Sequence, residues 1–130
     1  MNNIKIAEKL YESAKTNGLV ETLFAVYGNN IKVNIGYSKR ACETSIDEID
    51  FSVRSSNALK RTGLMTVGDV IDAIADEQLL RVRNLGKKSY CEIKTRIMKF
   101  GYDQLSENEK KAFFVDVVEK NRKEPLKNAV

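Results

Sequence analysis

The sequence contains no histidine, only two cysteines and a single proline. Without histidine, and with Cys42 and Cys91 as the only thiols, neither a metal cluster nor an obvious pair of nucleophile and base can be built. A glycine-rich phosphate loop is also missing. These absences argue against an enzyme, because no catalytic residue can be named, and we expect no cofactor and no metal.

Disulfide bonds and membrane spans are also disfavoured. Two cysteines do not make a disulfide framework, and they fit a reducing interior. Glu21 interrupts the apolar stretch that a secretory signal would need, and the uncharged run over residues 22–31 is too short to span a membrane. We therefore expect a soluble, cytoplasmic protein without a membrane partner.

Charge is distributed unevenly over the 130 residues. Residues 1–51 contain six Lys and Arg against seven Asp and Glu, residues 52–101 contain ten against five, and residues 102–130 contain six of each. A basic excess confined to one part of a protein is the footprint of a nucleic-acid surface. The alternative is a solvated basic face that binds nothing.

Clear local patterns occur toward both termini. Apolar residues at helical spacing predict an amphipathic helix over residues 4–17, which Gly18 ends. Alternation of apolar and polar residues about a Gly-Asn-Asn turn predicts a β-hairpin from Glu21 to Tyr37. Near the other end, Ser106 and Glu109 form a capping box that opens a helix with an apolar face. The tail after Arg122 is expected to fray.

The middle of the sequence predicts four helices in close succession, of which the fourth is longer. Ser52 caps a helix that Gly63 ends, and Thr66 with Asp69 forms a variant of the capping box for the second. Asp76 is expected to cap a short third helix. A turn over residues 83–86 then leads into the fourth, over residues 87–100, which Gly101 ends. The fold class is therefore mainly α.

Three cations fall where a helix disfavours them. Arg54 lies in the first turn of one predicted helix, and Lys87 and Lys88 lie in the first turn of another. A helix start already carries about half a positive charge, so that cations there cost a few tenths of a kcal/mol or more. We therefore expect an anion to complete both sites, and nucleic-acid phosphate fits best.

Three segments of the middle match a known pattern: Ile46-Asp-Glu-Ile-Asp-Phe-Ser-Val-Arg-Ser-Ser-Asn-Ala-Leu-Lys60, Thr66-Val-Gly-Asp69, and Val82-Arg-Asn-Leu-Gly-Lys-Lys-Ser89 with Glu92. Together they resemble the C-terminal domain of the bacterial RNA polymerase alpha subunit. The resemblance runs from Ile46 to about Leu105.

This resemblance implies a compact helical domain with helix-hairpin-helix elements that binds AT-rich DNA through the minor groove. Its groove-facing positions correspond here to Arg54, Asn57, Ala58, Gly86, Lys88, Ser89 and Glu92, to which the charge argument adds Lys87 as a phosphate attractor. Glu48 and Asp50 resemble an acidic patch that contacts a sigma factor. Ala58, often cysteine in that family, should tolerate the same close approach, and Glu92 is expected to orient Arg54 or Lys88 instead of touching DNA.

The residue types at three of these positions, Arg54, Asn57 and Gly86, also suit binding in a DNA minor groove. A narrow AT-rich minor groove attracts an inserted arginine, and Asn57, three residues after Arg54, lies on the same helical face and can bond acceptors on the groove floor. Alone, Asn57 would be a solvated helix residue. Gly86 allows the backbone to approach a DNA strand, although any turn into a helix can use glycine.

The sequence predicts three segments: an N-terminal extension over residues 1–45, a DNA-binding domain over residues 46–105, and a C-terminal helix and tail over residues 106–130. Because nothing in residues 1–45 resembles the assembly domain of the alpha subunit, we expect a protein distinct from that subunit. The flanking segments either provide a homodimer or partner surface or pack on the middle domain. The alternative function is a docking module that binds a sigma-like partner, or RNA polymerase, without binding DNA.

Overall fold

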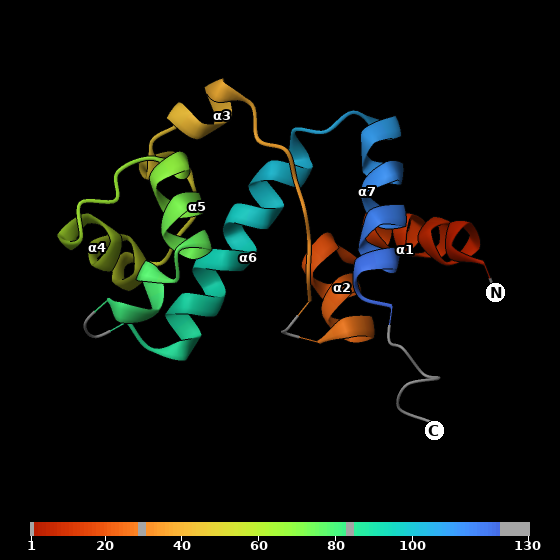
Figure 1. The fold of residues 1–130 in the computed structure, drawn as a ribbon, viewed down its shortest axis with the longest axis horizontal. Coiled ribbons are helices and arrows are strands. Elements are labelled where there is room, and N and C mark those ends of the chain that lie inside the picture. Colours follow the sequence, from red (N-terminus) through yellow and green to blue (C-terminus); the bar gives the residue numbers. More distant parts are fainter. Residues whose placement is uncertain (1, 29–30, 83–84, 123–130) are drawn as a thin grey trace. The chain divides into compact units, whose positions relative to one another are not determined.

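The computed structural model describes residues 2–28, 31–82 and 85–122, and these residues are mainly helical (Figure 1). They contain seven α-helices and two short 3-10 helices: α1 (Asn3–Asn17), α2 (Leu19–Tyr27), α3 (Lys39–Glu43), η1 (Ile46–Glu48), α4 (Val53–Arg61), α5 (Val67–Ala75), η2 (Gln78–Arg81), α6 (Lys87–Asp103) and α7 (Glu107–Lys120). The protein divides into two compact units. One comprises Met1–Ile35 with Leu105–Val130, and the other comprises Gly36–Gln104. We call them the terminal unit and the central unit.

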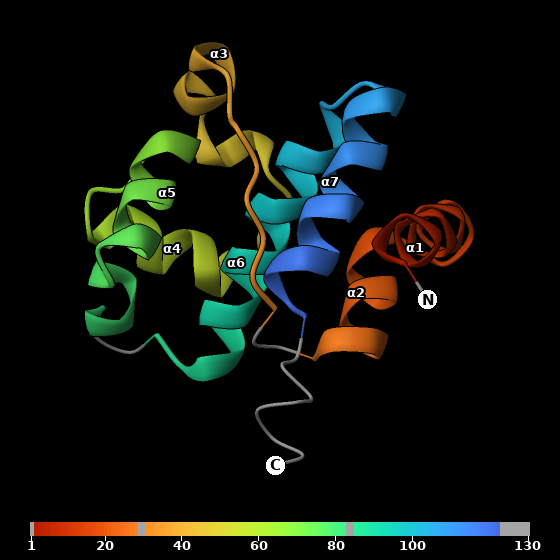
Figure 2. The same cartoon turned by 45° about the vertical axis from the view of Figure 1, so that its right-hand side comes forward.

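The terminal unit brings the first and last helices together. Helix α1 packs against both α2 and α7 (Figures 1 and 2). The buried hydrophobic side chains of this unit recur at helical spacing on each of the three helices: Ala7, Leu10, Tyr11, Leu19, Leu23, Phe113, Phe114, Val117 and Val118. The flanking segments thus share a core of their own, although the sequence patterns assigned them to separate segments.

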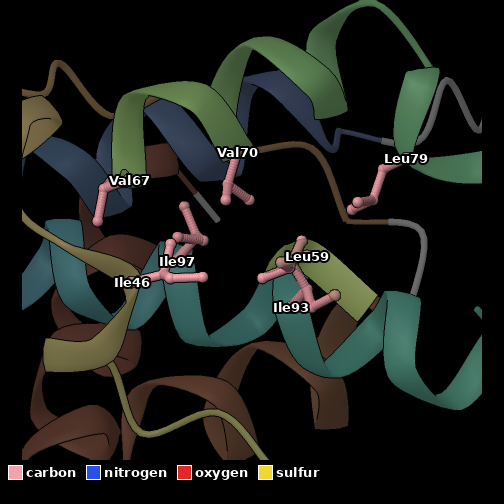
Figure 3. Packing of buried hydrophobic residues seen from close by; sticks show 7 residues of the cluster. All are labelled: Ile46, Leu59, Val67, Val70, Leu79, Ile93 and Ile97. Atoms are coloured by element: carbon pink, nitrogen blue, oxygen red, sulfur yellow. The ribbon is translucent and has the colours of Figure 1, made fainter. Parts of the chain in front are cut away.

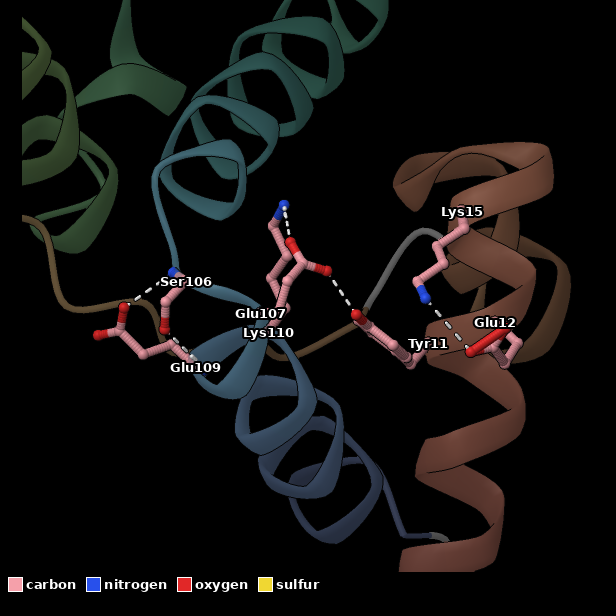
Figure 4. Close-up of polar contacts among 7 residues, drawn as sticks. All are labelled: Tyr11, Glu12, Lys15, Ser106, Glu107, Glu109 and Lys110. Atoms are coloured by element: carbon pink, nitrogen blue, oxygen red, sulfur yellow. Dashed lines mark hydrogen bonds and ion pairs between the residues drawn. The ribbon is translucent and has the colours of Figure 1, made fainter.

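Polar contacts fix the start of α7 within the terminal unit. The capping box is present as predicted, because the Ser106 hydroxyl accepts from the Glu109 N–H at 3.2 Å and the Glu109 carboxylate accepts from the Ser106 N–H at 2.9 Å. Figure 4 shows the neighbouring Glu107, whose carboxylate accepts from the Tyr11 hydroxyl of α1. That hydrogen bond joins residues 96 positions apart and holds the pKa of Glu107 below its usual value.

The core of the central unit is built from one or two side chains each of η1, α4, α5, η2 and α6. Figure 3 shows how they converge: Ile46, Leu59, Val67, Val70, Leu79, Ile93 and Ile97. All seven are at most 4% exposed. Burial of an aliphatic side chain of this size contributes roughly 1.5–3 kcal/mol. The core therefore fixes α4, α5 and α6 against one another.

Local signals set the ends of α4 and α5 as the sequence predicted. Ser52 caps α4, Gly63 follows its end with a φ of +82°, and Thr66 forms a capping box with Asp69 at the start of α5. The positive φ at Gly63 is a conformation that glycine adopts without a steric penalty.

The β-hairpin expected from Glu21 to Tyr37 is wrong. Its first half is helix α2, in which Leu19, Thr22 and Leu23 are buried at helical spacing, while Ile31–Tyr37 form no strand. A short apolar run can fit both the 3.6-residue period of a helix and the two-residue alternation of a strand. Here packing against α1 favours the helix. Asn29 and Asn30 of the expected turn lie outside the described residues.

Two predicted boundaries in the middle of the sequence are also wrong. Asp76 does not cap the third helix: its N–H bonds to the carbonyl of Asp72 at the end of α5. Gly101 does not end α6, which continues to Asp103 because Tyr102 buries its side chain there. Residues 83–84 of the expected turn and the tail from residue 123 lie outside the described residues.

Within the described part of the protein, no helix is long and apolar enough to cross a membrane.

Candidate nucleic-acid interface

The N-terminus of α4 presents the first predicted cation to solvent. The Ser52 hydroxyl caps this helix by accepting from the Ser55 N–H at 3.1 Å. Arg54 and, one turn later, Asn57 are both exposed. The first turn of α4 contains no acidic residue. The positive end of this helix therefore carries an added cation and no compensating carboxylate of its own.

The N-terminus of α6 has the same character. Gly86 occupies the N-cap position and has no side chain that could cap the helix. The first turn contains no acidic residue, and Lys87 and Lys88 are exposed. Ser89 is half-buried. Among the described residues, Arg54, Lys87 and Lys88 take part in no ion pair. These cations remain available to an anion.

Glycine at position 86 is not required by the fold. Its φ of −71° and ψ of 169° suit any residue, and a Cβ built there would meet nothing within 4 Å among the described atoms. The alternative that the helix entry itself demands glycine therefore has no support here. The absence of a side chain leaves the backbone open to close approach from outside.

The two cationic helix starts are joined by a hydrogen-bonded link between Ser52 and Glu92. The Glu92 carboxylate accepts from the Ser52 N–H at 3.3 Å and from the Ser52 hydroxyl at 2.9 Å. Because Glu92 lies in the second turn of α6, this contact sets the start of α4 beside the first part of α6. Sequence reasoning missed it, since no local signal connects residues 40 positions apart.

Burial raises the pKa of Glu92, but hydrogen bonds from the Ser55 and Ser52 side chains and the Ser52 backbone outweigh it, so that the net pKa is lowered. The carboxylate is thus held in its charged form. The carboxylate is hydrogen-bonded to Ser52, with no hydrogen bond to Arg54 or Lys88 among the described residues, and the expectation that Glu92 orients one of these cations stays a prediction.

The structure does not bring every predicted residue to the surface. Ala58 is only 1% exposed and packs in the interior, while its neighbour Asn57 is exposed. Of the two acidic positions, Glu48 is exposed, and the Asp50 side chain is 95% exposed with a carboxylate oxygen 3.9 Å from an Arg96 nitrogen. A pair this long and exposed contributes little to stability.

No cluster of metal-ligating side chains occurs among residues 2–28, 31–82 and 85–122. The residues gathered around the two helix starts are exposed cations and hydrogen-bond donors.

Comparison with known proteins supports the resemblance found in the sequence. Residues 37–99 match the family described as the C-terminal domain of the bacterial RNA polymerase alpha chain. The match lies wholly within the central unit, and it begins at Tyr37, nine residues before the start inferred from the motifs.

Two curated relatives are DNA-directed RNA polymerase subunits alpha. The one from Symbiobacterium thermophilum is 49% identical over 59 residues, covering 45% of this protein and 18% of its own length. The one from Moorella thermoacetica is 41% identical over 70 residues, covering 54% of this protein and 22% of its own length. The sequence thus spans about a fifth of these relatives, and no solved structure matches it significantly. The central unit is accordingly similar in sequence to the C-terminal domain of the bacterial RNA polymerase alpha subunit.

Proposed function

We propose that the central unit binds AT-rich DNA through the minor groove and acts, without catalysis, in transcription. The observation that carries this proposal is the pair of helix starts joined by the Ser52–Glu92 link, both bearing exposed cations and neither bearing an acidic residue in its first turn. A phosphate backbone supplies negative charge to Lys87 and Lys88 at the start of α6 and to Arg54 at the start of α4, where Glu92 already holds the Ser52 N–H.

The residues of the interface divide into groove-binding and phosphate-binding groups in this proposal. Arg54 enters the minor groove, whose negative potential is greatest at AT-rich sequences, and Asn57 bonds acceptors on its floor. Gly86 lets a strand come close to the backbone of α6, where Lys87, Lys88 and the Ser89 hydroxyl offer donors to phosphate. The sequence similarity to RNA polymerase alpha subunits supports a role in transcription, with polymerase or a sigma factor as partner.

Fluorescence anisotropy with an A-tract duplex at low salt tests the proposal. Arg54→Ala is expected to weaken binding about tenfold or more, since a specific contact between one residue and DNA is worth roughly 1–3 kcal/mol. Arg61→Ala is the matched control, because Arg61 is an exposed cation at the opposite end of the same helix. If about three phosphates are engaged, log K should fall with log salt with a slope near −3.

A parent protein that does not bind at low salt would refute the proposal. It would equally fail if Arg54→Ala and Arg61→Ala had the same small effect, because the interaction would then depend on net charge alone.

The second candidate is a docking module that uses Glu48 and Asp50, both of which are exposed. It predicts that Glu48→Lys and Asp50→Lys abolish capture of a sigma-like protein while Arg54→Ala has no effect on it. The cations of the interface, which take part in no ion pair among the described residues, favour the DNA function instead.

A small interface of this kind binds weakly by itself, and a second attachment raises the effective concentration of the first. The terminal unit is the part of the protein available for that role, as a homodimer or as a partner surface. Sedimentation of the full-length protein distinguishes the two: a dimer supports self-association, and a monomer supports a separate partner.

A further inference from the structure

Ser52 connects the start of α4 to α6 through its hydrogen bonds. Its hydroxyl oxygen accepts from the Ser55 N–H and so caps α4, and its own N–H and hydroxyl both face the Glu92 carboxylate of α6. Two residues later the backbone reaches Arg54. Any change in the position of Ser52 relative to α6 therefore moves the start of α4 and the base of the Arg54 side chain with it.

The polar groups around this link are paired with one another. Ser55 is fully buried, and its hydroxyl lies 3.1 Å from that of Ser52. The single hydroxyl proton of Ser52 cannot serve two acceptors at once, and the charged carboxylate at 2.9 Å is the stronger one. A polar network of this kind, once satisfied, favours one arrangement of the helices over others.

We infer that Ser52 and Glu92 are positioning residues for DNA binding, which act by fixing Arg54 relative to Lys87 and Lys88 without contacting DNA themselves. This inference rests on the proposed function. It also accounts for a carboxylate in a site that attracts phosphate: the repulsion from DNA is offset because Glu92 orders the cations around it.

The direction in which Glu92→Ala changes the DNA affinity distinguishes a positioning role of Glu92 from simple charge repulsion. If Glu92 were only a nearby negative charge, Glu92→Ala would strengthen DNA binding by removing repulsion. If Glu92 positions α4, the same substitution weakens binding, by about tenfold for the loss of hydrogen bonds to a charged group. Glu92→Ala leaves the cap of α4 intact, because Ser52 still accepts from Ser55. Glu92→Gln keeps an acceptor oxygen and should bind within about threefold of the parent.

Substitutions at Ser52 provide the second readout. Ser52→Ala removes the hydroxyl and should weaken binding about as much as Glu92→Ala, whereas Ser52→Thr restores the hydroxyl and should restore binding. Thr66→Ala is the matched control, since it removes the cap of α5 in the same unit but lies outside the interface. All affinities are measured by anisotropy at a temperature where circular dichroism shows each variant folded.

The inference also requires that the effect pass through Arg54. In an Arg54→Ala background, Glu92→Ala should change the affinity by less than about twofold, because the cation to be positioned is gone. Weaker binding by Glu92→Ala, rescue by Ser52→Thr and loss of the effect without Arg54 would support the inference.

Tighter or unchanged binding by Glu92→Ala, with a parent that binds, would overturn the positioning role and leave the DNA function standing. A parent that does not bind A-tract DNA at all would overturn both.

Discussion

The phenol of Tyr37 is expected to make the stability of the protein depend on pH in the alkaline range. This residue precedes α3, and its hydroxyl donates to the Ile97 carbonyl of α6 at 3.0 Å. Burial, with a contribution from the nearby Cys42, raises the pKa of Tyr37 from 10.0 to about 12. The folded protein therefore favours the protonated phenol.

The sign and size of the resulting pH dependence follow from linkage. A raised pKa means that the contribution of Tyr37 to stability is complete below about pH 10 and is lost as the pH rises through about 12. The free energy of unfolding should fall by about 1.4 kcal/mol by about pH 11 on this account alone. Tyr37→Phe removes both the hydrogen bond, worth about 1 kcal/mol, and the ionisation.

The order of stability of the parent and Tyr37→Phe should therefore reverse as the pH rises. The variant is expected to be less stable by about 1 kcal/mol at about pH 8, equally stable between about pH 10.5 and 11, and more stable above that. Urea denaturation followed by circular dichroism at a series of pH values measures the difference, in which the ionisation of lysines common to both proteins cancels. Two stability curves that stay parallel up to about pH 11.5 would refute the reasoning.

Two further predictions concern the terminal unit and the interface. Phe114 is fully buried, with its ring edge-to-face against Tyr11 and Phe113, so Phe114→Ala should lower the free energy of unfolding by about 3–5 kcal/mol, measured by urea denaturation. Gly86→Thr should leave stability within about 0.5 kcal/mol, because threonine and glycine are similar at an N-cap, but should weaken binding to A-tract DNA by obstructing a strand. Unchanged binding would contradict the close approach at Gly86.

Much of the central unit could be predicted from local chemistry. Ser52, Gly63 and the Thr66–Asp69 capping box act within one turn of the helix ends that they set, so that their residue types and spacing suffice. The amphipathic pattern of α1 and the capping box of α7 were predicted correctly for the same reason. The motifs around Arg54 and Gly86 were also enough to indicate the family resemblance.

Errors arose where a distant contact outweighed a local preference. Residues 19–27 fit a strand nearly as well as a helix, and packing against α1 decided the outcome. Gly101 is a typical helix end, yet α6 passes through it because Tyr102 gains more by burial than glycine costs, about 1 kcal/mol.

The sequence by itself determined that this protein is mainly helical, where most of its helices begin, and that cations gather at two of those starts. Only the tertiary structure decided that the first and last helices share a core, that Ala58 is buried while Asn57 is exposed, and that Glu92 bonds to Ser52 and not to Arg54. The physical reason is the separation along the sequence over which each kind of interaction acts. Capping and periodicity act over a few residues, whereas burial and the pairing of polar groups depend on which distant segments the fold brings into contact.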